Sequence, residues 1–171
     1  MLVSLSWHQL SPYATDISTD VAESSARPNL AKCLLYVYVD SCQHLMRTGK
    51  LPSPQVELRI GNGQKQLTEP QHFTVNPVFE KSLVFIVEHP NTLNVVVKDS
   101  LLSSKSASNV SRCILGKTSI QMSDLILKQR MECSPPQPFN FQDGYQGTIT
   151  MSVRLRAITE LKEIAAAKNP I

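Results

Sequence analysis

Short apolar runs separated by turn residues fill the middle of this 171-residue chain. Val, Ile, Tyr and Phe dominate these runs and Gly, Asn or Pro bounds most of them, which is typical of β-strands. The stretch Gly-Asn-Gly at 61–63 predicts a hairpin turn, because Asn and Gly accept positive φ. One short helix is expected at 123–130, and seven or eight short strands with so little helix indicate an all-β sandwich. The expected strands are 33–40, 55–60, 64–69, 78–87, 92–99, 113–120, a weak one at 139–142, and 147–158.

The last expected strand has the most regular alternation. Ile149, Met151, Val153 and Leu155 fall on one face, and Thr, Ser and Arg residues fall on the other. Residues 1–10 alternate in the same phase, about one domain length earlier, and such self-similarity suggests repeated domains. We therefore interpret 1–10 as the last strand of a preceding domain. The alternative is an ordinary edge strand added to a single domain.

Polar segments divide the rest of the chain. Residues 11–30 are rich in Ser, Thr, Asp and Pro without apolar periodicity, which is typical of a linker. The Ala-rich tail offers few apolar anchors, so we expect it to begin another linker. The expected organisation is a terminal strand at 1–10, a linker at 11–30, one domain at 31–158 and a second linker at 159–171.

The composition excludes some classes of function. The chain has 17 basic and 14 acidic residues and a net charge of +3, which is too balanced for the concentrated basic face of a nucleic-acid binder. Apolar runs stay shorter than the roughly 18 residues that a membrane-spanning helix needs. We therefore expect no nucleic-acid partner and no transmembrane segment.

Candidate chemistry is sparse. The cysteines at 33, 42, 113 and 133 form no Cys-x-x-Cys pair and no metal pattern with the four histidines, so reduced thiols and no cofactor are expected. The chain has no Gly-x-Ser-x-Gly elbow. Asp40 and Asp99 are candidates for a carboxylate pair, but aspartates at strand ends more commonly cap turns. We expect no catalytic residues and no enzymatic activity.

One stretch carries a family resemblance. The run "TVNPVFEKSLVFIVEHP" at 74–90, followed by a strand that ends at Asp99 and by Leu115-Gly116, resembles the hallmark of C2 domains. The resemblance covers about 31–158. The segments 34–45 and 85–99 look most like the second C2 domain of the extended synaptotagmins. Residues 1–10 would then match the last strand of the first C2 domain.

This resemblance implies an eight-stranded antiparallel sandwich whose apical loops meet membranes. It also implies a tethering, lipid-transfer protein on the cytosolic face of the endoplasmic reticulum, at contacts with the plasma membrane. The implied partners are anionic membrane phospholipids, bound weakly, and a neighbouring C2 domain in the same chain. The alternative is a C2 domain that serves as a protein-interaction scaffold and binds no lipid of its own.

The family resemblance also implies a calcium site that this sequence has lost. Calcium needs about six to eight oxygen ligands, mostly from carboxylates. The family's five aspartates fall near Thr48 or Gly49 and then at Ser53, Asp99, Leu101 and Cys113, so one acidic residue of five remains. We predict no metal site, no calcium binding below about a millimolar, and a solvated turn at Asp99.

The loops around 41–54 and 98–113 should lie at one end of the family's fold. Five basic residues near an anionic membrane, Lys98 included, contribute at most about 5 kcal/mol at about 1 kcal/mol each. That corresponds to a dissociation constant near the millimolar range, which is useful only beside other membrane-binding domains. The predicted lipid contacts are Arg47, Lys50, Leu51, Leu101, Leu102, Lys105 and Arg112.

Overall fold

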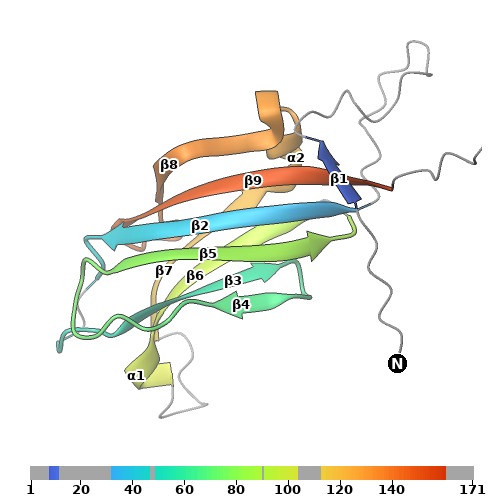
Figure 1. The fold of residues 1–171 in the computed structure, drawn as a ribbon. Coiled ribbons are helices and arrows are strands. Elements are labelled where there is room, and N and C mark those ends of the chain that lie inside the picture. Colours follow the sequence, from blue (N-terminus) through green and yellow to red (C-terminus); the bar gives the residue numbers. More distant parts are fainter. Residues whose placement is uncertain (1–7, 12–31, 47–48, 90, 104–112, 161–171) are drawn as a thin grey trace, which may run out of the picture.

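Two antiparallel β-sheets lie face to face in the computed structural model, which describes residues 8–11, 32–46, 49–89, 91–103 and 113–160 (Figure 1). Strands β2 to β9 confirm the expected eight-stranded antiparallel sandwich, and β1 adds a short ninth strand. The strands are β1 (His8–Ser11), β2 (Cys33–Gln43), β3 (Pro54–Ile60), β4 (Lys65–Leu67), β5 (Val78–Val87), β6 (Thr92–Asp99), β7 (Ile114–Gln121), β8 (Glu132–Asn140) and β9 (Thr148–Glu160).

Each sheet is built around long central strands. In the first, here called sheet A, β2 pairs with β5 on one side and with β9 on the other. The second edge of β9 is shared, because β8 pairs with its first part and β1 with its last four residues. In the second, called sheet B, the order is β4-β3-β6-β7. The core lies between the two sheets.

The inner face of β9 shows how strand alternation builds this core. Ile149, Met151, Val153 and Leu155 are all fully buried, as the sequence predicted. Burying one such side chain stabilises the fold by about 1.5–3 kcal/mol. The alternate residues face the outside of sheet A and include Arg154, which is exposed. The pleat alone sorts these two sets, since successive side chains point to opposite faces.

The predicted hairpin turn at 61–63 and the predicted start of a strand at residue 78 are confirmed. The hairpin between β3 and β4 closes through a bond from the Gly63 amide to the Ile60 carbonyl at 2.9 Å, and Gly61 has a φ of +49°. At the start of β5, the Pro77 carbonyl accepts a bond from the Cys42 amide at 2.9 Å. Since proline has no amide to donate, regular pairing in β5 begins at Val78.

The predicted helix at 123–130 is wrong in extent. Helix α2 covers Met122–Ile126, and a 3-10 turn at Gln129–Met131 follows, with Arg130 at a φ of +66°. The other helix, α1 (Ser100–Ser103), has four residues. Among the described residues, neither helix has the length and apolarity needed to cross a bilayer.

The weak strand predicted at 139–142 is also wrong in extent, because β8 begins at Glu132. Its prolines disguise it in the sequence, since proline cannot donate to a β-ladder and normally argues against a strand. The structure accommodates them at a sheet edge, where the pairing with β9 slips between Cys133 and Gln137. Tertiary pairing on both sides of the slip outweighs the poor local propensity.

The predicted linkers and most of the predicted preceding-domain strand lie outside the residues that the structure describes. Residues 1–7, 12–31 and 161–171 do not belong to the described residues. His8–Ser11 pairs antiparallel with the end of β9, and β9 extends to Glu160, two residues past the predicted domain boundary. The interpretation of 1–10 as part of another domain therefore stays a prediction.

All four cysteine thiols are buried. Burial raises the pKa of Cys33 to about 11 and that of Cys42 to about 12. These two thiols stay protonated at neutral pH and are poor nucleophiles. They therefore behave as small core residues rather than as reactive groups.

Candidate functional site

Three connecting segments meet at one end of the sandwich, where β2 ends and β5 begins (Figure 1). They are the β2–β3 loop, the β4–β5 loop and helix α1 after β6. The amide of Thr74 donates to the Pro52 carbonyl at 3.0 Å, and the amide of Ser100 donates to the Ser53 carbonyl at 2.9 Å. Main-chain bonds thus join the three segments into one surface, which we call the loop end.

Ser53 is the centre of these connections. It is fully buried, and its amide donates to Oδ1 of Asp99 at 3.2 Å. Its hydroxyl Oγ accepts from the amide of Phe73 at 3.5 Å. Ser53 therefore contacts both neighbouring segments, Asp99 through its amide and the β4–β5 loop through its hydroxyl, at a position to which the C2 resemblance assigns a carboxylate.

Asp99 has a structural partner set. Its Oδ1 accepts from the Leu101 amide at 3.1 Å as well as from the Ser53 amide. The first of these bonds, two residues along the chain, is the usual way in which an aspartate caps a turn. Asp99 is also buried, so the prediction of a solvated turn residue is wrong about the solvation. The amide of Ser53 lies 46 residues away along the chain, a contact that sequence alone does not reveal.

The donors that the structure describes at this end are too few for a calcium ion. Among the described residues, no group of three or more His, Cys, Asp or Glu side chains lies together. Asp99 offers one carboxylate, and its Oδ1 already receives two backbone amides. Ser53 and Leu101 stand at two of the positions to which the sequence resemblance assigned ligands, and Thr48 lies outside the described residues.

Several predicted lipid contacts do lie at the loop end. Leu51 in the β2–β3 loop and both Leu101 and Leu102 in α1 are exposed apolar side chains. Lys50 is exposed beside Leu51. The other predicted contacts lie outside the described residues: Arg47, Lys105 and Arg112.

Lys98, which the sequence placed in the cationic patch, does not contribute to the loop end. Its Nζ lies 2.7 Å from Oε2 of Glu57, on the outer face of sheet B. The cationic patch expected from the sequence is therefore smaller by one charge. The register places Lys98 opposite Gln55, and this brings its flexible side chain within reach of Glu57.

Phe73 is the residue that sequence reasoning missed. It lies in the β4–β5 loop with 64% of its surface exposed and a φ of +54°. Its ring centroid is 6.1 Å from that of His72. The available signal was an aromatic residue inside the polar stretch "EPQHFTVN". Phe73 adds a fourth exposed apolar side chain to the loop end, and a group of such side chains is typical of a binding surface.

Comparison with known proteins agrees with this geometry. A family description of the C2 domain matches residues 33–136, which is more than half of the chain. Among curated proteins, "Multiple C2 domain and transmembrane region protein 6" of Arabidopsis thaliana is 29% identical over 113 residues. That match covers 63% of this chain and 10% of the relative.

Two solved structures of extended synaptotagmin 2 are similar to the whole described fold. One contains its SMP domain and its tandem pair of C2 domains; it has 25% sequence identity and a TM-score of 0.69, and the match covers 91% of this chain and 34% of that one. The other contains the same pair of C2 domains with calcium bound, and has 26% identity and a TM-score of 0.68. That match covers 91% of this chain and 54% of that one. This chain thus spans about half or less of each relative.

Proposed function

Because this chain belongs to the C2 domain family, we propose that it is a calcium-independent C2 domain that makes weak contact with anionic phospholipids. The observation that carries the proposal is the state of Asp99, the one acidic residue left of the family's ligand set. Its Oδ1 bonds the amides of Ser53 and Leu101. The loop end is therefore held together without a metal ion.

The energetics support calcium independence. Neutral hydroxyl and carbonyl oxygens at Ser53 or Leu101 do not compensate for missing carboxylates, since calcium affinity depends on the charge of its ligands. Turning Asp99 toward a metal would also break its hydrogen bonds to two amides, and the loss of the buried one to Ser53 costs about 1–3 kcal/mol. We expect no calcium binding below about a millimolar.

The exposed surface of the loop end supports a membrane contact. Leu51, Leu101, Leu102 and Phe73 project apolar surface beside Lys50. Complete burial of a phenylalanine contributes about 1.5–3 kcal/mol, and each nearby basic residue adds about 1 kcal/mol. These sums give weak binding by the isolated domain, which becomes effective when other domains of the same protein bind too.

The larger role in this proposal is tethering. Similarity to structures of extended synaptotagmin 2 that contain paired C2 domains supports a neighbouring C2 domain in the same chain as a partner. We place the domain in a lipid-transfer tether on the cytosolic face of the endoplasmic reticulum, at contacts with the plasma membrane. Its part there is auxiliary and non-catalytic.

The first ten residues enter this proposal as the last strand of the preceding domain. Their alternation in phase with that of β9 supports it. Deleting Met1–Leu10 is then expected to leave the melting temperature of the remaining chain nearly unchanged. A drop of several degrees would instead make the segment part of this core.

Liposome co-sedimentation tests the function directly. The chain is mixed with vesicles of neutral lipid or of neutral and anionic lipid, with calcium or with chelator. We expect binding to the anionic vesicles in both conditions, falling steeply at about 0.5 M salt, where exposed charges are screened. Phe73→Ser is expected to weaken binding about tenfold. Leu127→Ser is the matched control, since Leu127 is an exposed apolar residue next to α2, at the other end of the sandwich (Figure 1).

Three results would contradict the proposal. Binding that appears with calcium and disappears with chelator would show that the domain has a calcium site. Equal losses in Phe73→Ser and Leu127→Ser would separate lipid binding from the loop end. No binding to either vesicle would leave the protein-scaffold alternative in its place.

A further inference from the structure

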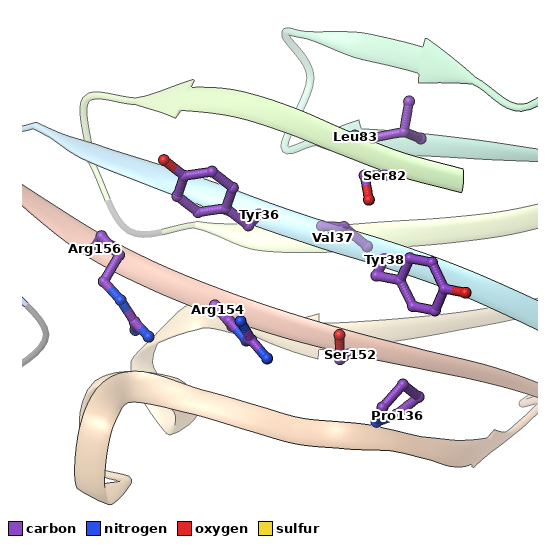
Figure 2. Close-up of a pocket in the computed structure, with 9 residues that line it drawn as sticks. All are labelled: Tyr36, Val37, Tyr38, Ser82, Leu83, Pro136, Ser152, Arg154 and Arg156. Atoms are coloured by element: carbon purple, nitrogen blue, oxygen red, sulfur yellow. The ribbon is translucent and has the colours of Figure 1, made fainter. Parts of the chain in front are cut away.

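A groove of about 650 Å³ runs along the outer face of sheet A, away from the loop end. Tyr36 and Tyr38 of β2 and Ser152 of β9 lie along its floor, and Arg154 extends from β9 toward β8 (Figure 2). Pro136 of β8 forms part of the far wall. This wall exists because β8 slips against β9 between Cys133 and Gln137.

Beside the groove, part of β2 and part of β5 carry apolar residues on the outer face as well as on the inner face. An antiparallel sheet with one solvated face normally alternates apolar and polar residues. Here Tyr36 pairs with Val84 and Leu34 with Ile86, all on the outer face. Val84 and Ile86 are 43% and 55% exposed. A contiguous apolar area rimmed by polar groups is typical of a protein-binding surface.

The opposite rim is cationic and already ordered. Glu132 lies 2.6 Å from Nη2 of Arg156 and 3.7 Å from Nε of Arg154. Arg154 also donates to the Ser134 hydroxyl at 2.9 Å, and half of its side chain remains exposed. Arg156 is only 19% exposed and serves mainly to support this rim. Among the described contacts of these arginines, one carboxylate faces two guanidinium groups, so the rim keeps a positive charge.

The other end of the groove has the opposite character. Desolvation raises the pKa of Tyr38, and the carboxylates of Asp40 and Glu80 raise it further. Asp40 follows Tyr38 by two residues and Glu80 precedes its partner Ser82 by two, so both carboxylates stand at this end, whereas Arg154 pairs with Tyr36 toward the other. A bound segment would be oriented by this gradient, with its acidic group beside Arg154.

We propose that this groove binds an acidic peptide segment of a protein partner, with an apolar side chain over Tyr36 and Val84 and a carboxylate on Arg154. Tyrosine and arginine are the side chains that most often dominate the energy of such interfaces. A guanidinium held in place also binds a carboxylate with little loss of side-chain freedom. The choice of a protein rather than a lipid as occupant rests in part on the proposed membrane contact of the loop end.

Two observations favour this occupant and this mode of binding. The β2 strand from Tyr36 to Gln43 extends for about 23 Å, so a domain standing on its loop end holds Arg154 well away from the bilayer. The free edge of β5 is also blocked, because the side-chain amides of Gln64 and Gln66 donate to the carbonyls of Ile86 and Val84 at 2.7 and 2.6 Å. A partner therefore meets the face of the sheet rather than adding a strand to it.

Fluorescence anisotropy with the full chain tests the proposal. The probe is a labelled peptide of about eight residues, long enough to span the groove, that combines Glu with Val and Phe. A second peptide has Gln in place of each Glu. We expect the acidic peptide to bind at least about tenfold more tightly, and Arg154→Glu to remove that advantage. Arg59→Glu is the matched control, since Arg59 is a similarly exposed arginine on the opposite sheet, beside Glu57.

A second variant separates docking from simple charge attraction. Val84→Lys adds positive charge but removes an apolar contact, so the proposal expects weaker binding of the acidic peptide. Tighter binding by Val84→Lys, or equal losses in Arg154→Glu and Arg59→Glu, would overturn it. A third result would also overturn it: the peptide does not bind, and Arg154→Glu abolishes binding to anionic vesicles. That result would assign the cationic rim to lipid binding. Thermal melts of all variants confirm that each remains folded, and an unfolded Arg154→Glu is replaced by Arg154→Gln.

Discussion

The outer faces of the two sheets use charge differently. On sheet B, Glu57 is surrounded by cations and lies 2.7 Å from Lys98, 3.0 Å from Arg59 and 3.7 Å from Lys65. Its side chain is 8% exposed, although it stands on an outer face. On sheet A, Glu132 has a similar place between two arginines but is 18% exposed, and those arginines line an open groove.

This difference separates a face built for stability from one suited to a partner. The sheet B cluster satisfies a nearly buried carboxylate from several sides, and Lys98 and Arg59 come from two different strands. On sheet A, the charges lie across β2 from exposed Val84 and Ile86, whose apolar surface contributes little to this fold. Similar residue types thus have different consequences, because burial determines the strength of each ion pair.

Neutralising the two carboxylates is expected to have the largest effect. Glu57→Gln should lower the free energy of unfolding by about 1.5–3 kcal/mol, since it removes charge-assisted bonds to a nearly buried group. Glu132→Gln should cost less, about 0.5–1 kcal/mol, because its partners are closer to water. Chemical denaturation at neutral pH measures both. Equal costs would remove the contrast between the faces.

The second prediction concerns pH. Desolvation opposes ionisation of Glu57, but its bonds to Lys98 and Arg59 prevail and lower its pKa below the usual 4.5. A carboxyl with a lowered pKa in the folded state adds stability that is complete above its unfolded pKa and is lost as the pH falls through the folded value. The stability gap between wild type and Glu57→Gln should therefore be constant above about pH 5.5 and shrink below about pH 4.5. A gap that widens in acid would mean that folding raises the pKa of Glu57 instead of lowering it.

The smallest effect on stability is expected from substitutions on the outer face of sheet A. Val84→Thr and Ile86→Thr keep β-branched side chains at exposed positions, so each should change the free energy of unfolding by less than about 0.5 kcal/mol. Each should nevertheless weaken binding of the acidic peptide. Denaturation and anisotropy on the same samples make this check. A large loss of stability with unchanged binding would assign these residues to the fold instead.

Much of the architecture was predictable because β-structure is encoded locally. The alternation of Ile149 to Leu155 identifies the inner face of β9, since the pleat turns each successive side chain over. The bounds of β5 and β6 were predicted to the residue. That positions 101 and 113 hold Leu and Cys is likewise a fact of the sequence, and the proposal of calcium independence starts from it.

Only the tertiary structure decided which of these residues meet. Lys98 reaches Glu57 across 41 residues of chain, Asp99 binds an amide 46 residues away, and the groove joins Tyr36 to Arg154. The exposure of Phe73 and the strand built around the prolines of β8 belong to the same group. Such contacts depend on strand register and on the packing of one sheet against the other. Because those are properties of the assembled sandwich, the local pattern of the sequence determined where the strands lie, and the fold determined what their side chains contact.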